Sequence, residues 1–224
     1  MKINKVVLSL CGLAVLATGL WMYFRGRSGP PNLAAVAANL DDAISKQDAG
    51  RIVSLISSEE RKALDLDESK VQKLLDSFYT PQLRGFNPKQ EADVRPFPYE
   101  MLLSRQKTLV NERGAKAELG LFVQNTEEGV TGQDVVFWLV ASGLNAQLAS
   151  QGKTNRGLEG LRNRREALVK EMDTLRATGV PGVVISDNIE ATRQVLTWEQ
   201  FLAFLDKKIA KVEKRTKELG QRAN

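Results

Sequence analysis

The most constraining feature of the sequence is a run of 19 uncharged residues near its start, Val6 to Phe24. Only Ser9 and Thr18 in this run are polar, and basic residues stand on both sides of it. As a helix the run would be about 28 Å long, close to the ~30 Å hydrocarbon core of a bilayer. We therefore predict a transmembrane helix within residues 1–27, with the membrane-flanking side chains Lys2, Lys5, Trp21, Tyr23, Arg25 and Arg27.

Other interpretations account less well for this segment. A signal peptide cleaved at Ala17-Thr18-Gly19 would leave the apolar residues Leu20 to Phe24 at a new amino terminus, with nothing to bury them. A lipoprotein needs a small residue before Cys11, but a leucine stands there. A buried core helix disagrees with the break at residues 28–31. We therefore expect a retained signal-anchor.

The orientation of this anchor follows from its short leader, which favours an amino terminus inside the cell. The rest of the chain would then lie outside the cytoplasm, in keeping with a body that has no cysteine to be oxidised. The expected localisation is the cell membrane, with a single pass and an extracytoplasmic domain. The expected partners are the lipid bilayer and another membrane or extracytoplasmic protein.

The formal net charge of +5 is concentrated at the two ends of the chain. Residues 28–224 have 28 basic and 27 acidic side chains, so the body is nearly neutral. The middle of the chain therefore offers no evident surface for a polyanion, and we expect no nucleic acid partner. The expected division is a membrane anchor at 1–27, a linker at 28–32, an α+β juxtamembrane domain at 33–205 and a basic helical tail at 206–224.

Residue types exclude most familiar active sites. The chain has no histidine and its only cysteine is Cys11, which removes Ser-His-Asp and Cys-His catalysis, Cys/His zinc sites and internal disulfides. Ser104 and Lys107 are the nearest pair for a serine-lysine hydrolase, but strand residues three apart project to opposite faces. We therefore predict no enzyme, and no catalytic, cofactor-binding or metal-binding residues.

Helical patterns fill the first third of the body. Apolar residues spaced four and three apart predict a helix over 33–44, and Asp48 can cap a second, short helix. Ser57 to Glu60 fits a capping box, in which each side chain bonds the other residue's backbone N–H. A further helix is expected from about Asp67, ending at Thr80-Pro81.

The period then changes to alternation, which predicts an antiparallel meander with strands at 101–110, 116–125 and 133–142. Both faces of the third segment are apolar, so we place it in the sheet centre. A helix near 161–177, a turn and short strand at 179–186 and a helix capped by Thr197 with Gln200 complete the chain. The predicted fold class is α+β, with an N-terminal transmembrane helix followed by helices packed on an antiparallel sheet, and C-terminal helices.

The stretch from Leu40 to Ile56, LDDAISKQDAGRIVSLI, resembles the opening of the nuclear-transport-factor-like α+β cone family. The resemblance covers about residues 33–142. It implies a curved sheet around a pocket, which some members use as an enzyme site and many only for binding. The aspartate and tyrosine of isomerase-type members have no counterpart that the resemblance identifies here.

Basic side chains supply the only candidate contacts within the body. They gather in a run around residues 153–165 and again along the last helix, where an apolar seam from Trp198 to Leu219 repeats every four and three residues. For the run at 153–165 we favour a solvated loop and helix face over a binding site, because such charge runs are common. The candidate anion or lipid contacts are Arg156, Arg162, Arg164, Arg165, Lys211, Lys214 and Arg215.

Three functional hypotheses follow. The sequence favours a non-catalytic, single-pass membrane-anchored interaction or assembly module, such as an accessory subunit of a membrane complex. A ligand-binding or enzymatic cone instead requires a deep apolar pocket holding a carboxylate or tyrosine of shifted pKa. An anionic-lipid-binding surface domain requires the basic run near Arg162 and the terminal lysines to share one surface.

Overall fold

The computed structural model describes residues 33–88, 93–96, 102–186 and 193–222. Among these residues no helix is both long and apolar enough to cross a membrane, which corrects the transmembrane part of the predicted fold class. The expected anchor, its signal-anchor character and its flanking residues Lys2, Lys5, Trp21, Tyr23, Arg25 and Arg27 all fall within 1–27, outside the described part of the chain.

The helices predicted for the first third are confirmed. They are α2 (Leu33–Ser45), α3 (Ala49–Leu55), α4 (Ser58–Ala63) and α5 (Glu68–Leu74). The side chains of Asp48, Ser57 and Asp67 each accept a backbone N–H in the first turn of the following helix. Such caps satisfy amides that have no partner within the helix, so the local sequence fixes where these helices begin.

The expected stop at Thr80-Pro81 is wrong. A π-helical turn, η1 (Leu75–Tyr79), follows α5 directly and leads into α6 (Thr80–Leu83). Pro81 lies in the first turn of α6, a position where the missing N–H and the fixed φ of proline are tolerated. The helical path therefore continues past the proline.

The main sheet contains β1 (Phe86–Pro88), β2 (Asp93–Pro96), β3 (Leu102–Asn111), β4 (Lys116–Thr126) and β5 (Gly129–Gln133). β3 and β4 form the predicted antiparallel pair, from Leu102 opposite Gln124 to Val110 opposite Lys116. β1 and β2 both pair with β3, β5 pairs with β4, and all pairings are antiparallel. The predicted antiparallel sheet is therefore confirmed for its first two long strands.

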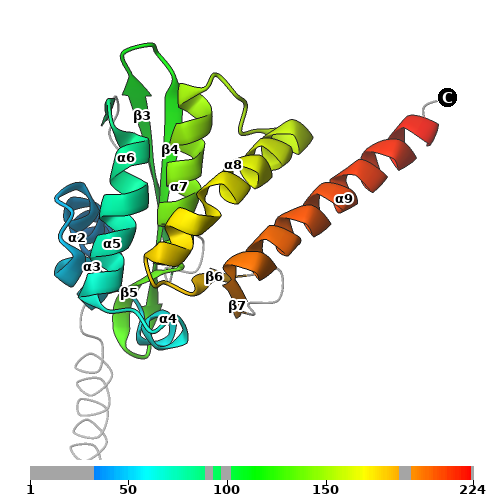
Figure 1. Ribbon diagram of the computed structural model, residues 1–224. Coiled ribbons are helices and arrows are strands. Elements are labelled where there is room, and N and C mark those ends of the chain that lie inside the picture. Colours follow the sequence, from blue (N-terminus) through cyan, green and yellow to red (C-terminus); the bar gives the residue numbers. More distant parts are fainter. Residues whose placement is uncertain (1–32, 89–92, 97–101, 187–192, 223–224) are drawn as a thin grey trace, which may run out of the picture. The chain divides into compact units, whose positions relative to one another are not determined.

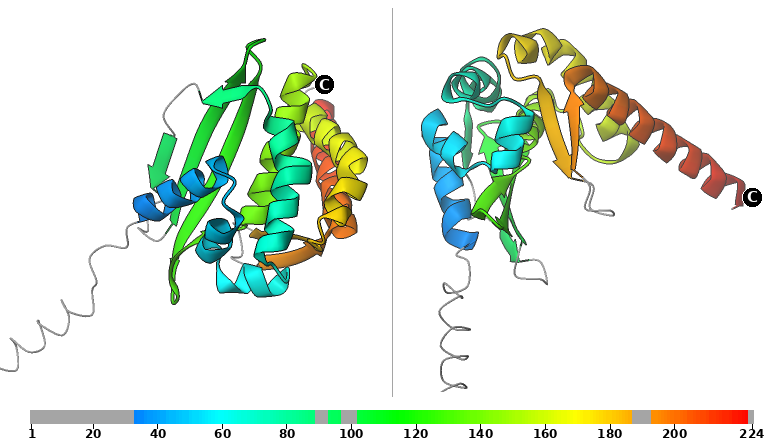
Figure 2. Two further views of the ribbon diagram at one scale, coloured as in Figure 1. Left: turned by 60° about the vertical axis from the view of Figure 1, so that its left-hand side comes forward. Right: turned by 90° about the horizontal axis from the view of Figure 1, so that it is seen from below.

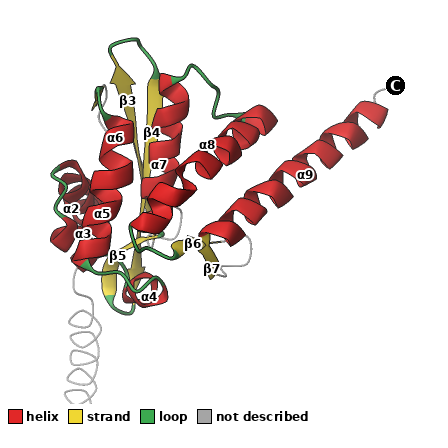
Figure 3. Ribbon diagram, viewed as in Figure 1, coloured by secondary structure: helices red, strands yellow, loops and turns green. Residues whose placement is uncertain are grey.

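The predicted third strand at 133–142 is wrong: after the short β5 the chain enters helix α7 (Val135–Ser150), coloured as a helix beside β4 in Figure 3. A continuous apolar run fits a buried helix as well as a buried strand, because it has no period to distinguish them. The length of the apolar run favours a helix, because the run continues to Leu148 and a central strand is rarely so long. The helix also continues past the end of the predicted strand, as far as Ser150.

The C-terminal elements follow the prediction closely. They are α8 (Gly157–Ala177), β6 (Gly182–Ser186), β7 (Arg193–Thr197) and α9 (Trp198–Arg222). The strand β7 was not expected, and it pairs with β6 in a separate two-stranded sheet. The capping box of α9 is confirmed in both directions, because Gln200 N–H donates to Thr197 Oγ1 and Thr197 N–H donates to Gln200 Oε1.

The core lies between the sheet and the helices, as Figure 1 and the left view of Figure 2 show. Alternate residues of one strand share a face, so Ala117 and Val123 mark the inner face of β4. Val123 clusters with Ala37 of α2, and Ala117 with Ala146 of α7. These two helices therefore cover the same face of the sheet. The largest fully buried side chains are Trp198, Phe78, Leu40, Ile52, Ile56, Leu64, Leu74, Leu75, Leu144, Leu148, Leu168 and Leu175.

Candidate functional site

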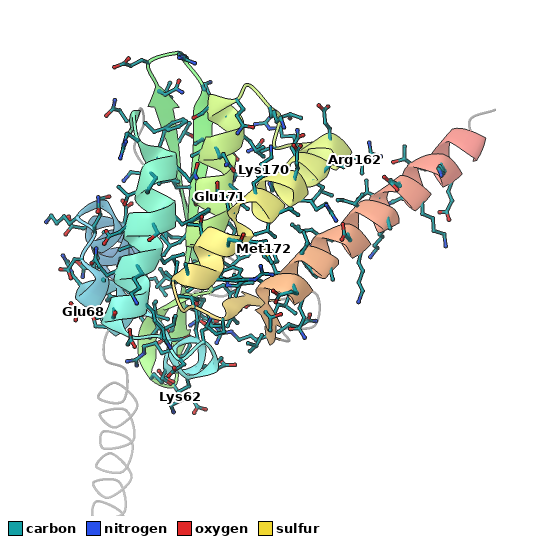
Figure 4. All side chains as sticks on the ribbon, viewed as in Figure 1. Lys62, Glu68, Arg162, Lys170, Glu171 and Met172 are labelled. Carbon is teal, nitrogen blue, oxygen red and sulfur yellow. The ribbon has the colours of Figure 1, made fainter. Side chains whose placement is uncertain are left out.

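The candidate basic residues lie on two neighbouring helices. Arg156 directly precedes α8, and Arg162, Arg164 and Arg165 lie in its first half. Lys211, Lys214 and Arg215 lie in the second half of α9. Figures 1 and 4 show α8 and α9 side by side, with Arg162 labelled near the amino-terminal end of α8.

Three of the four candidate arginines at α8 are paired with carboxylates of the same chain. Arg162 Nη2 lies 2.6 Å from Glu213 Oε1, and Arg165 Nε lies 2.7 Å from Asp206 Oδ1. These two pairs join α8 to α9 and use acids that interrupt the basic sequence of α9. Arg156 pairs more loosely with Glu118 of β4, at 3.5 Å. Much of the predicted anion-binding charge is therefore neutralised within the fold.

Arg164 differs from its neighbours, because the described part of the chain places no carboxylate within ion-pair distance of it. Its Nε donates to Asn145 Oδ1 at 3.2 Å, and its Nη2 donates to the carbonyl of Asn155 at 2.7 Å. Burial lowers the pKa of Arg164, which means that its surroundings disfavour the charge. The hydrogen bonds of the guanidinium thus go to neutral acceptors, while the more distant carboxylate of Glu118 favours its charge.

The second half of α9 exposes both apolar and basic side chains. Leu205 is buried, but further along the same seam Val212 is 36% and Leu219 is 59% exposed. The acids Asp206, Glu213 and Glu218 already lie within 4.0 Å of a basic group. Among the described residues, no carboxylate pairs with the α9 cations Lys207, Lys208, Lys211, Arg215 and Lys217. This half of α9 is therefore an amphipathic, basic surface.

A small, partly open cavity lies between α2, η1, the sheet and α7. Lys107 Nζ lies 3.0 and 2.9 Å from the two carboxylate oxygens of Asp41, and both side chains are mostly buried. Tyr79, the last residue of the π-helical turn, lines the same cavity, and burial together with Asp41 raises the pKa of its hydroxyl. The cavity is about 20 Å³, enough for about one water molecule. It is far smaller than the deep pocket that a ligand-binding cone requires.

Glu60 does not complete the capping box that the sequence predicts for it. Ser57 caps α4 as predicted, accepting the Glu60 N–H at 3.3 Å, but the Glu60 carboxylate does not return the bond. Instead Ser57 N–H donates to the carbonyl of Gly132, and Glu60 accepts N–H bonds from Val135 and Val136 at the start of α7. No local sequence signal reveals this, because the donors come from a distant segment.

No group of three or more Cys, Asp or Glu side chains in the described part of the chain is arranged to hold a metal ion. Comparison with known proteins adds no assignment, since no family model, no curated protein and no solved structure matches this chain. The resemblance to the nuclear-transport-factor-like cone family therefore stays a prediction.

Proposed function

We propose that the protein is a non-catalytic interaction module that binds an acidic protein partner through the second half of α9. The single observation that carries this proposal is the exposed apolar seam of α9, at Val212 and Leu219, flanked by cations without carboxylate partners in the described residues. The right-hand view of Figure 2 shows this half of the helix extending away from the sheet. Isolated helices in water depend on packing, so an apolar stripe continuing beyond the domain favours a further contact.

Charge identifies the kind of partner. A second copy of α9 would bring like charges together, which disfavours pairing of this helix with itself. A helix or surface with carboxylates beside its apolar residues would instead pair with Lys208, Lys211 and Arg215. Such pairs speed association and select the partner, while burial of Val212 and Leu219 supplies affinity. The partner is therefore expected to be acidic.

Photo-crosslinking in cells tests the proposal. A photoreactive amino acid is placed at Val212 or at Leu219 of the full chain, and for control at the exposed Lys73 of α5. We expect one discrete protein adduct from positions 212 and 219, none from position 73, and identification of an acidic surface in the adduct by mass spectrometry.

A charge reversal sharpens this test. Lys211→Glu with Arg215→Glu should abolish the adduct at position 212, whereas Lys73→Glu with Lys62→Glu, an equal change of charge on other helices, should leave it intact. Adducts that form equally at all three positions, or that survive reversal of the α9 charges, would show that α9 does not select an acidic partner.

A further inference from the structure

A second hollow is lined by residues of the β3–β4 turn, the carboxyl-terminal end of α7 and the segment leading into α8. Figure 1 shows these three segments toward the upper end of the view. Its volume is about 230 Å³, against about 20 Å³ for the cavity beside Tyr79. Three separate segments supply its polar lining: Lys116 from β4, Asn145 from α7, and Lys153, Thr154 and Asn155 from the segment before α8.

Backbone contacts fix the wall formed by residues 151–156. The N–H groups of Gly152 and Lys153 donate to the carbonyls of Ala149 and Leu148, at 3.1 and 2.9 Å. These bonds occupy acceptors at the negative end of α7, which would otherwise repel an anion. Asn155 packs tightly on α8, because a Cβ atom at Gly160 would lie 2.2 Å from its carbonyl carbon. The hollow is therefore preformed.

The polar groups that face this hollow are mainly hydrogen-bond donors. Asn145 Oδ1 accepts a hydrogen bond from Arg164, so the side-chain amide N–H groups of Asn145 are left to donate to a ligand. No described carboxylate pairs with Lys116. Lys153 pairs with Glu166 at 3.1 Å, but Glu166 also binds Lys170 at 3.0 Å, so one carboxylate serves two ammonium groups.

The charge around the hollow is positive overall. Lys116, Lys153 and the adjoining Arg156 and Arg164 are opposed by two nearby acids, Glu118 and Glu166. Arg164 donates hydrogen bonds to Asn145 and Asn155, two residues that line the hollow, and both acceptors are neutral. An anion in the hollow would add counter-charge beside Arg164, because the carboxylate that acts on Arg164, that of Glu118, also pairs with Arg156.

We propose that this hollow binds a small oxyanion, a phosphate or carboxylate group, through Lys116, Lys153 and the amide of Asn145, with Arg164 behind them. The volume admits such a group with a few further atoms attached. Arg156 and Arg164, two of the residues singled out in the sequence, adjoin this hollow, whereas Arg162 and Arg165 serve the contact with α9. The inference is independent of α9 and of the proposed partner.

Isothermal titration calorimetry of the full chain tests the inference, with sodium phosphate and sodium citrate as probes and sodium chloride at matched ionic strength as the reference. We expect saturable one-site binding of at least one oxyanion, and none of chloride. Tighter binding of phosphate assigns the hollow to phosphate groups, and tighter binding of citrate assigns it to carboxylates. Absence of saturable heat with both probes overturns the proposal.

Three variants separate binding at this hollow from general charge effects. Lys116→Ala removes an exposed side chain without a described ion-pair partner and should weaken binding about tenfold. Lys73→Ala removes the same charge from α5 and should change nothing. Asn145→Asp gives Arg164 an ion-pair partner, so it should preserve the fold yet abolish anion binding. Equal weakening by Lys116→Ala and Lys73→Ala, or full binding by Asn145→Asp, contradicts the proposal.

Discussion

Glu60 Oε1 lies 3.0 Å from the backbone nitrogen of Val136, a residue 76 positions further along the chain. Its other oxygen lies 3.1 Å from the nitrogen of Val135, and the side chain is fully buried. Asp134, which directly precedes α7, makes no side-chain cap bond to this helix. Glu60 therefore supplies from α4 the acceptors that a local capping residue would otherwise provide.

The burial of Glu60 predicts that stability depends on pH. Burial raises its pKa to about 7, in spite of the two amides that favour the charged form. Because the folded state then holds the proton more tightly than the unfolded state, Glu60 stabilises the fold fully below pH 4.5 and loses that contribution as the pH rises to about 7. The expected loss is about 3 kcal/mol. Urea unfolding at pH 4.5 to 8 measures it.

Glu60→Gln provides the control for this pH profile, since the amide has a similar shape and does not titrate. The difference in unfolding free energy between the native chain and Glu60→Gln should shrink or change sign as the pH rises through this range. Parallel profiles for the two proteins would mean that the pKa of Glu60 is the same in the folded and the unfolded state, which contradicts the prediction.

Removing the Glu60 side chain tests its capping role. Glu60→Ala leaves two buried N–H groups of α7 without acceptors, and we expect a loss of about 3 kcal/mol in the free energy of unfolding at pH 7. The neighbouring Glu59→Ala breaks only an exposed ion pair with Arg193 and should cost less than about 1 kcal/mol. Similar losses in the two variants would contradict the assigned role.

Local signals predicted the elements whose determinants are local. Thr197 with Gln200 and Asp48 marked two helix starts correctly, because a cap and its amide are only a few residues apart. Alternation predicted β4 because Ala117, Leu121 and Val123 on one of its faces are buried and the residues of the other face are not. The hydrogen bonds of Glu60 to α7 could not be predicted, because they join distant segments and because residues 133–142 were predicted as a strand.

The same limit applies to the candidate contacts. Sequence order placed Arg162 and Arg165 in one basic run, but their neutralising acids, Glu213 and Asp206, lie on α9 and become neighbours only through helix packing. The hollow beside Arg164 likewise combines residues of three elements. A charge run in a sequence therefore identifies cations without showing which of them are already paired.

Close packing of α7 against η1 gives a further prediction. A Cβ atom at Gly143 would lie 2.6 Å from Cε1 of the buried Phe78. Gly143→Ala should therefore cost about 1–3 kcal/mol through overpacking, measured by chemical denaturation. Phe78→Leu shortens the opposing side chain, so the double variant should be more stable than the sum of the two single losses predicts. Strict additivity would show that the two residues do not meet.

Shortening α9 distinguishes a binding element from a structural one. A chain ending at Ile209 keeps the buried residues Trp198, Phe201 and Leu205 and loses exposed side chains together with the exposed Arg162–Glu213 pair. We expect the free energy of unfolding to fall by about 1 kcal/mol or less, because exposed ion pairs contribute little. Phe201→Ala, which empties a core position, should cost about 3–5 kcal/mol.

The shortened chain should be folded and yet fail to bind the acidic partner. If truncation instead destabilises the fold as strongly as Phe201→Ala, the second half of α9 belongs to the structural core, and the exposed seam is not a docking element.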